Sequence, residues 1–394
     1  MSDARRLRLW ATAAVTFTAV TIPASVLCAQ TSQPRRLGPP HAILDEEFTV
    51  IAAVRELADG RILVTDEKDG RVVVADFSTG ETAQIGRQGS GPGEYRQIGR
   101  IWPLAGDSSI LKEPFSPRWL LLNAAQVVAT VGPGDASVRT VGTSRIMGAG
   151  GQGHVVWAQF ARDAAGRAAV NDSLLVVRLD RGTQRVDTIG RVQSETGWSA
   201  EAGVSENATA VAAATGGAPR RPTYVIALAA PDQVAVFPDG WVAIVRARPY
   251  RVDWCPPDSP CRTGQALGAA TLRMSDREKR AYLAVAAATH SWPPTTNLEE
   301  TSGWPNTVPP FATPTSRIDG TAVTPLVDGR LLIERLPTAD SPVRRYDVIA
   351  RSGLLVSQLH MELAERIVGA SARYLYVTVL DTVGIQRLRR HPLP

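Results

Sequence analysis

One stretch, residues 54–95, constrains the fold more than any other because it contains a complete four-stranded β-meander. Asp59-Gly60 and Asp69-Gly70 separate its short apolar runs. Asp-Gly between such runs is the strongest short hairpin signal, since glycine tolerates the positive φ of primed turns. The runs at 62–64 and 72–74 are continuously apolar, which predicts strands buried on both faces. A meander covered on both faces is one blade of a β-propeller.

The same pattern returns twice further along the chain. ELADGRILV from residue 56, VFPDGWVAI from residue 236 and PLVDGRLLI from residue 325 share an Asp-Gly turn in one register. An internal repeat built only of strands predicts a propeller, and six blades of about 40–45 residues plus insertions account for the length. We therefore expect an all-β, six-bladed β-propeller of four-stranded antiparallel blades over residues 41–394, with insertions at 194–222 and 273–320.

The two ends of this region predict how the ring closes. The last blade shows three strand-like runs before the sequence ends, and His41 to Val50 forms a strand-like run without a partner in the first blade. Pairing them satisfies an edge that would otherwise invite aggregation. We expect residues 41–50 to be the outer strand of blade six, antiparallel to residues 385–390. The second insertion opens with Ser275-Asp-Arg-Glu278, a capping box that predicts a helix over 277–289.

The blade-one sequence resembles a known family. ELADGRILVTD and the glycine-rich segment Gly86–Tyr95 are similar to secreted bacterial six-bladed β-propellers, which in turn resemble NHL-repeat propellers. The resemblance implies the fold and no particular activity, because propellers host both binders and enzymes. The glycine-rich segment lacks the lysine and the following helix of a phosphate loop. We interpret it as an inter-blade turn whose amides are capped by Glu94.

The N-terminus predicts export. Arg5-Arg6-Leu7-Arg8 precedes an apolar run over 9–22 that is too short for a membrane span, so we expect residues 1–29 to be a signal peptide. Cys28 leaves a lipid-anchored alternative open, although Leu27 before it is large for that role. Residues 30–40 form a polar, proline-rich lead that we expect to be flexible. No other segment is apolar enough to span a bilayer.

Two cysteines remain after removal of the signal peptide, Cys255 and Cys261. An even count in an exported chain predicts a disulfide between them. The net charge of +5 is scattered, whereas nucleic-acid binding would require a clustered basic face. We expect a periplasmic or extracellular monomer whose partner is a protein or small-molecule ligand on a propeller face.

The catalytic signals are weak. The sequence has no nucleophile elbow, and its five histidines lack metal-site spacing. The calcium-dependent gluconolactonase-like and paraoxonase-like hydrolases also have six blades, and Glu56 is placed like the first of their oxygen ligands. The asparagines of their later blades are missing here. We therefore assign no metal and no cofactor, with calcium at Glu56 retained only for the alternative of a lactonase-type hydrolase acting at the central channel.

The favoured function is a binding or scaffold module. Arg55 and Arg100 lie near inner strands, where they would make the channel mouth cationic, unless they are simply solvated. His154 is expected where an innermost strand begins, and the alternative is a histidine with ordinary structural partners. Trp292 and Trp304 lie in the second insertion, where aromatic residues either contact a ligand or hold the insertion down as a satellite core.

Overall fold

The structure of the protein is a computed structural model. It describes residues 34–114, 116–142, 144, 146–161, 173–193, 232–269, 271–288, 304, 306–311 and 322–394. The predicted signal peptide and the predicted insertion at 194–222 lie outside these residues. Residues 32–394 make up one compact unit.

Each blade is an antiparallel meander whose strands follow one another in sequence. Blade one contains β3 (Ile51–Glu56), β4 (Ile62–Asp66), β5 (Arg71–Ala75) and β6 (Thr82–Ile85). Blade two contains β9 (Ile101–Pro103), β10 (Ser108–Lys112), β11 (Trp119–Asn123) and β12 (Gln126–Val131). Blade three contains β13 (Ile146–Ala149), β14 (His154–Phe160), β15 (Ser173–Asp180) and β16 (Val186–Gln193).

The second half of the chain repeats this plan. Blade four contains β17 (Gln233–Val236), β18 (Val242–Arg246) and β19 (Arg251–Cys255). Blade five contains β22 (Val323–Pro325), β23 (Leu331–Arg335), β24 (Arg344–Ile349) and β25 (Leu355–Met361). Blade six contains β26 (Glu365–Ala370), β27 (Tyr374–Leu380) and β28 (Gln386–Pro392).

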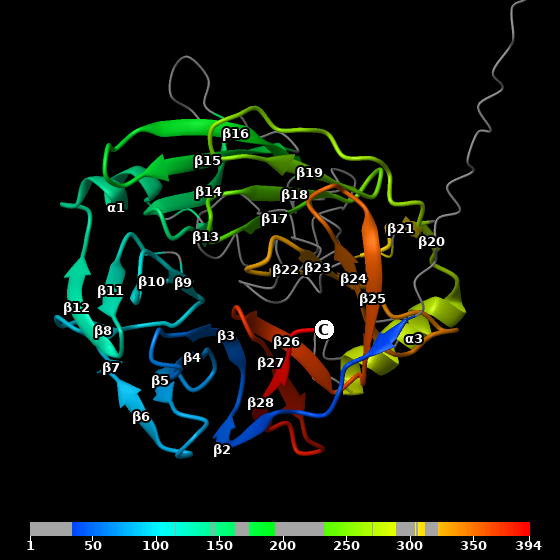
Figure 1. Cartoon of the computed structure of the whole chain (residues 1–394), viewed down its shortest axis with the longest axis horizontal. Coiled ribbons are helices and arrows are strands. Elements are labelled where there is room, and N and C mark those ends of the chain that lie inside the picture. The colour runs from blue at the N-terminus through cyan, green and yellow to red at the C-terminus, as the bar shows by residue number, and fades with distance from the viewer. Residues whose placement is uncertain are drawn as a thin grey trace, which may run out of the picture. The chain divides into compact units, whose positions relative to one another are not determined.

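The innermost strands form a closed ring. β3 contacts β9, β9 contacts β13, and the series continues through β17, β22 and β26 back to β3, as Figure 1 shows. The protein is a six-bladed β-propeller, as the repeat predicted. Two glycines permit the close approach of neighbouring inner strands: a Cβ on Gly148 would lie 2.5 Å from the Val236 Cβ, and one on Gly369 would lie 2.5 Å from the Val54 carbonyl oxygen.

The hydrophobic core is divided among the six junctions between blades. Each junction holds one cluster of buried side chains contributed by both blades. Between blades one and two, for example, Leu63 packs in the same cluster as Leu111 and Leu120. The continuously apolar strands are therefore needed because each blade packs on a neighbour through both of its faces. β4, whose five residues are all buried, confirms this expectation for blade one.

The predicted ring closure is confirmed. β2 (Ala42–Phe48) pairs antiparallel with β28, and Leu44 lies opposite Leu388. Leu44 and Phe48 are fully buried in the cluster between blades six and one. Gln386 accepts a hydrogen bond from the Ile51 backbone amide (2.9 Å), which links the closing blade to the first strand of blade one. The N-terminal strand thus holds both ends of the ring together.

Several elements differ from the sequence-based expectation. Blade three begins with β13, so His154 lies in the second strand and not in the innermost one. The prediction failed because the glycine-rich sequence around Gly148 resembles a turn, whereas its glycine is required for close strand packing. A short helix, α1 (Ala136–Val141), was not predicted; Asp135 caps its N-terminus. β1 (Arg35–Arg36) pairs parallel to β25 within the stretch expected to be a flexible lead.

Blade four has three strands instead of the expected four in the described part of the chain. The chain returns beside β19 as an irregular segment, in which Arg262 and Trp254 exchange two backbone hydrogen bonds of 2.7 and 2.9 Å. Cys255 and Cys261 form the predicted disulfide across this return. Two further pairs of short strands are β7 (Arg87–Gln88) with β8 (Glu94–Tyr95), and β20 (Leu272–Arg273) with β21 (Thr307–Val308).

The predicted helix is α3 (Asp276–Ala288), which lies at the rim beside β25 and β1 in Figure 1. Ser275 accepts a hydrogen bond from the Glu278 amide at 3.4 Å, so one half of the capping box forms. The Glu278 carboxylate instead accepts the Ala339 amide (2.9 Å) and fastens the helix to the β23–β24 turn. Neither described helix has the length and apolar character needed to cross a membrane.

Candidate functional site

Arg55, predicted at the channel mouth, is buried and points into the neighbouring blade. Its guanidinium donates to the carbonyl oxygens of Gly106 (2.6 Å) and Ser108 and to the Ser109 hydroxyl. Burial lowers the pKa of Arg55 to about 10, with nearby Asp107 acting in the opposite direction. These bonds make Arg55 a clamp between blades one and two.

Glu56 is also engaged by a neighbouring blade. Its carboxylate accepts a short hydrogen bond from the Tyr376 hydroxyl and lies 3.5 Å from an Arg373 guanidinium nitrogen. Burial, followed by the hydrogen bond to Glu56, raises the pKa of Tyr376. A carboxylate serving a hard cation needs its oxygens free to coordinate, whereas both oxygens of Glu56 contact blade six.

Arg100 and His154 occupy different places in the ring. The Arg100 guanidinium stacks over the Trp102 ring at 5.3 Å from its centroid. His154 begins the second strand of blade three, and its Nε2 lies 3.9 Å from an Asp180 carboxylate oxygen. The structure does not bring these two residues together with Arg55 and Glu56 into one cluster of contacting side chains.

Of the two tryptophans predicted to contact a ligand in the second insertion, the structure describes one. Trp292 lies outside the described residues. Trp304 packs edge-on against Tyr282, with ring centroids 5.8 Å apart, in a small cluster that also contains Met274, Leu283, Val308 and Leu336. This is the satellite core that the sequence offered as the alternative to ligand contact. Burial raises the pKa of Tyr282 to about 12, as expected for a side chain with structural contacts.

Buried carboxylates bind the backbone where the chain enters a blade. Asp66 accepts the amides of Thr49 (2.9 Å) and Val50 (3.0 Å) before β3. Glu113 accepts the Arg96 amide (2.9 Å) before β9. Glu113 in blade two thus performs the task that Asp66 performs in blade one. Glu94 caps the Gly91 amide (2.7 Å), as expected for an inter-blade turn.

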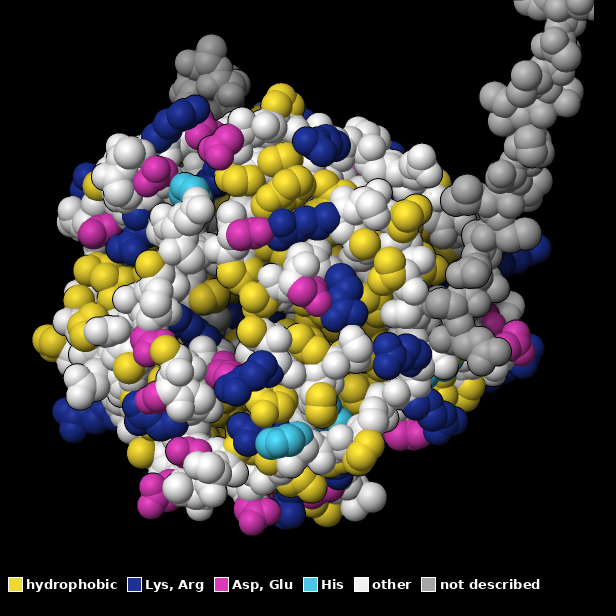
Figure 2. Space-filling view, viewed as in Figure 1, with side chains coloured by type: hydrophobic (Ala, Val, Ile, Leu, Met, Phe, Trp, Pro, Cys, Tyr) yellow, Lys and Arg dark blue, Asp and Glu magenta, His cyan; other side chains and the backbone are white. Residues whose placement is uncertain are grey.

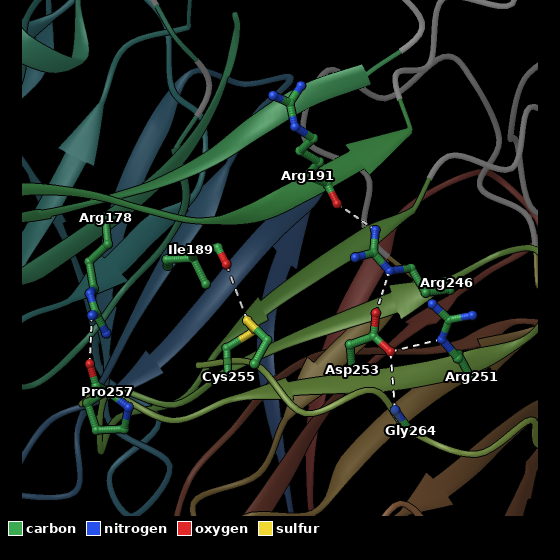
Figure 3. Close-up of a disulfide and its surroundings, with 10 residues drawn as sticks. Arg178, Ile189, Arg191, Arg246, Arg251, Asp253, Cys255, Pro257 and Gly264 are labelled. Atoms are coloured by element: carbon green, nitrogen blue, oxygen red, sulfur yellow. Dashed lines mark hydrogen bonds and ion pairs between the residues drawn. A yellow bond between two sulfur atoms is a disulfide. The ribbon is translucent and has the colours of Figure 1, made fainter. Parts of the chain in front are cut away.

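A polar network on β18 and β19 of blade four contains another bonded carboxylate, as Figure 3 shows. Asp253 accepts bonds from Arg246 (2.7 Å), Arg251 (2.9 Å) and the Gly264 amide (3.2 Å). Contacts with these groups lower the pKa of Asp253 even though burial opposes the shift. In the same figure the disulfide loop is tied to blade three by a bond from Arg178 to the Pro257 carbonyl oxygen (2.6 Å).

A buried polar network at the junction of blades four and five was not predicted. Asp347, which is 1% exposed, accepts the Tyr250 hydroxyl (2.8 Å), Arg335 (2.7 Å) and Gln358 (2.8 Å). Arg335 also stacks over the Tyr250 ring and donates to the Pro310 carbonyl oxygen (3.2 Å). The network joins two blades and the insertion. Sequence alone offered no signal for it, because its members lie on separate strands.

The described residues contain no group of three or more His, Cys, Asp or Glu side chains arranged to hold a metal ion. Their buried carboxylates are bonded to arginines, hydroxyls or backbone amides instead. The donor set therefore does not fit the calcium site of the hydrolase alternative within the part of the chain that is described.

Comparison with known proteins agrees with the geometry of the ring. Residues 45–107 match the model of a family described as a 6-bladed beta-propeller. The resemblance found in blade one is thereby confirmed. None of the curated proteins matches this sequence.

Solved structures with related folds include three at about one-tenth sequence identity. A calcium-binding protein, regucalcin, from Agrobacterium tumefaciens has 10% identity and a TM-score of 0.44, covering 91% of this chain and 97% of its own. A putative exported protein from Bacteroides fragilis has 10% identity and a TM-score of 0.47, covering 94% and 98%. A putative gluconolactonase has 10% identity and a TM-score of 0.43, covering 92% and 97%. Similarity at this level carries no argument about activity or ligand.

Proposed function

We propose that this protein is an exported binding or scaffold module that does not carry out chemistry in its central channel. The observation that carries this proposal is the engagement of Arg55 and Glu56, the two polar side chains at the end of the first inner strand. Both bond to neighbouring blades. Residues engaged in this way hold the ring rigid, and a rigid propeller presents its loops as a binding surface.

The recognition surface that we propose lies on blade five, at the end that carries the β23–β24 turn and the helical insertion. Leu336 in that turn packs in the satellite core with Tyr282 and donates its amide to the Pro310 carbonyl oxygen (3.0 Å). Arg277 on α3 pairs with Asp340 of the same turn (2.6 Å). The described part of the insertion is thus held in a defined position, which a binding surface requires.

Export is part of this proposal. The basic and apolar pattern of residues 1–29 supports a signal peptide. The disulfide between Cys255 and Cys261 supports an oxidising compartment, because such bonds persist outside the cytosol. A periplasmic or extracellular monomer accommodates both observations.

The test compares the channel with the blade-five surface. A thermal-shift screen of soluble ligands is run on the full protein and on two variants, Tyr282→Ala and Glu56→Gln. Stabilisation by a ligand should be weakened in Tyr282→Ala, which removes the satellite core, and retained in Glu56→Gln. If ligand stabilisation is instead lost in Glu56→Gln and retained in Tyr282→Ala, the site lies in the channel and the proposal is overturned.

The hydrolase alternative is tested in the same preparation. A resident calcium site would stabilise the protein by ~2.7 kcal/mol at a hundredfold excess over its dissociation constant. We expect no change in melting temperature on adding calcium or a chelator, and no turnover of a panel of lactones. Calcium-dependent melting together with lactone hydrolysis would establish the alternative.

A further inference from the structure

Four basic side chains lie in register across blade five. Arg335 on β23 is directly opposite Arg345 on β24, Arg345 is opposite His360 on β25, and His360 is opposite Arg36 on β1. Side chains at opposed positions project from the same face of a sheet, and like charges placed there destabilise it. A row of this kind therefore requires negative charge from elsewhere in the protein or from a ligand.

The acidic side chains that contact the row pair with the residues at its two ends, Arg335 and Arg36. Asp347 bonds to Arg335, Tyr250 and Gln358. Glu362 lies 3.8 Å from Arg36 at an exposed position. The middle of the row, formed by Arg345 and His360, has no ion pair among the described residues.

The middle pair also has unused hydrogen-bonding atoms. Arg345 donates to the Leu336 carbonyl oxygen at 3.3 Å. The Nε of Arg345 and the Nε2 of His360 are buried and have no hydrogen-bond partner in the described part of the protein. Buried polar atoms are normally satisfied, so each such atom requires an explanation, and a bound ion or ligand group is a recognised one.

Neighbouring cations act on both members of the middle pair. Burial, and then the charges of Arg345 and Arg36, lower the pKa of His360. Burial, and then the charge of Arg335, lower the pKa of Arg345, with Asp347 acting in the opposite direction. In both groups burial is the larger cause, and repulsion from the neighbouring cations adds to it.

The exposure of the row increases toward the outer edge of the blade. The Arg335 side chain is 16% exposed beneath the insertion, whereas Arg36 is 86% exposed at the rim. Figure 1 shows β25 and β1 at this outer edge, beside α3. A ligand that approaches from the rim would meet Arg36 first and Arg345 with His360 next.

We propose that Arg345 and His360 form a binding site for an oxyanion, a phosphate or carboxylate group carried by the ligand of the blade-five surface. This inference rests on the proposed binding function and names the chemical class of its ligand. A planar guanidinium suits both groups because it donates two parallel hydrogen bonds to adjacent oxygens. His360 adds a donor and, when protonated, a second positive charge.

The experiment uses inorganic phosphate and succinate as separate probes of the full protein, with the two ring nitrogens of His360 followed by NMR during a pH titration. An oxyanion stabilises the protonated ring, so binding should raise the pKa of His360. The probe that shifts this pKa at the lower concentration identifies phosphate or carboxylate as the preferred group. An unchanged His360 titration with both probes would overturn the proposal.

Variants locate the effect. Arg345→Gln should weaken probe binding by at least about tenfold, the loss expected for a charge-assisted hydrogen bond, and Arg345→Lys should retain part of it. Arg185→Gln removes the same charge from an exposed position just before β16, the outer strand of blade three, and should have no effect. Equal weakening in both glutamine variants would show non-specific attraction and refute the site. If Arg345→Gln does not fold, His360→Gln provides the same comparison by calorimetry.

The outcome is distinguishable from failure of the proposed function. Ligand binding at blade five without any response to phosphate or succinate would remove this site and leave the binding function intact. Oxyanion binding at His360 together with calcium-dependent lactone hydrolysis would retain this site and remove the proposed function.

Discussion

The closing strand β2 allows a sharp test of how the ring is held together, because two adjacent residues on it face opposite ways. Leu44 is 0% exposed and packs between blades six and one, whereas Ile43 is 50% exposed. Truncating a fully buried leucine to alanine costs about 2–5 kcal/mol, from lost burial plus the cavity left behind. Truncation of an exposed side chain stays within about 0.5 kcal/mol. Leu44→Ala should therefore remove a large share of a stability that is typically about 5–15 kcal/mol, and Ile43→Ala should remove almost none.

The measurement is urea unfolding followed by tryptophan fluorescence and, separately, by circular dichroism. A loss of about 3 kcal/mol at a slope of about 3 kcal/mol per molar urea moves the midpoint by about 1 M. Two truncated chains extend the test, one starting at Pro39 and one starting at Thr49. The second lacks all of β2 and with it the buried Leu44 and Phe48, so it should be strongly destabilised and prone to aggregation.

Equal midpoints for Leu44→Ala and Ile43→Ala would contradict the register of β2 against β28. Equal stability of the two truncated chains would show that the ring remains closed without β2. Either result would refute the reasoning that the N-terminal strand holds the first and last blades together.

Three further predictions concern other features of the ring. Glu113→Ala removes the carboxylate that pairs with the half-buried Arg118 and accepts the Arg96 amide, so it should cost about 1–3 kcal/mol in urea unfolding; a loss below about 0.5 kcal/mol would contradict the bridging role. Gly148→Ala forces a methyl group into the next inner strand and should cost about 1–3 kcal/mol, while Gly132→Ala, which enters open space, serves as its near-neutral control. Replacing both Cys255 and Cys261 by alanine should cost about 2 kcal/mol, because the bond closes a short loop; two free thiols in a thiol assay of the oxidised protein would rule the bond out.

The blades were predictable because their signals are local. Apolar runs bounded by Asp-Gly turns fix the strand ends, and the positive φ of Gly60 (89°), Gly240 (87°) and Gly329 (88°) confirms the shared turn in all three repeats. The closing strand was predictable by elimination, since the last blade lacked its outer strand and the run over residues 41–50 lacked a partner in the first blade. The innermost strand of blade three was predicted wrongly because Gly148, a glycine needed for close strand packing, cannot be distinguished in sequence from a turn glycine.

The candidate site was far less predictable. The sequence placed Arg55 and Glu56 at the end of an inner strand and left open whether they serve a ligand or the fold. The tertiary structure directs Arg55 toward blade two and Glu56 toward Tyr376, which is 320 residues away in the chain. It also aligns Arg345 with His360 and Arg36, whose spacing in sequence follows no motif.

The sequence by itself therefore determined the fold class, the strands around the repeated Asp-Gly turns and the closure of the ring, because turn chemistry and apolar patterning act over a few neighbouring residues. Only the tertiary structure decided which polar side chains are engaged and which remain free. That depends on which blades become neighbours and on the register between their strands. A side chain's bonding partner is chosen by this packing, across sequence distances that no local pattern records.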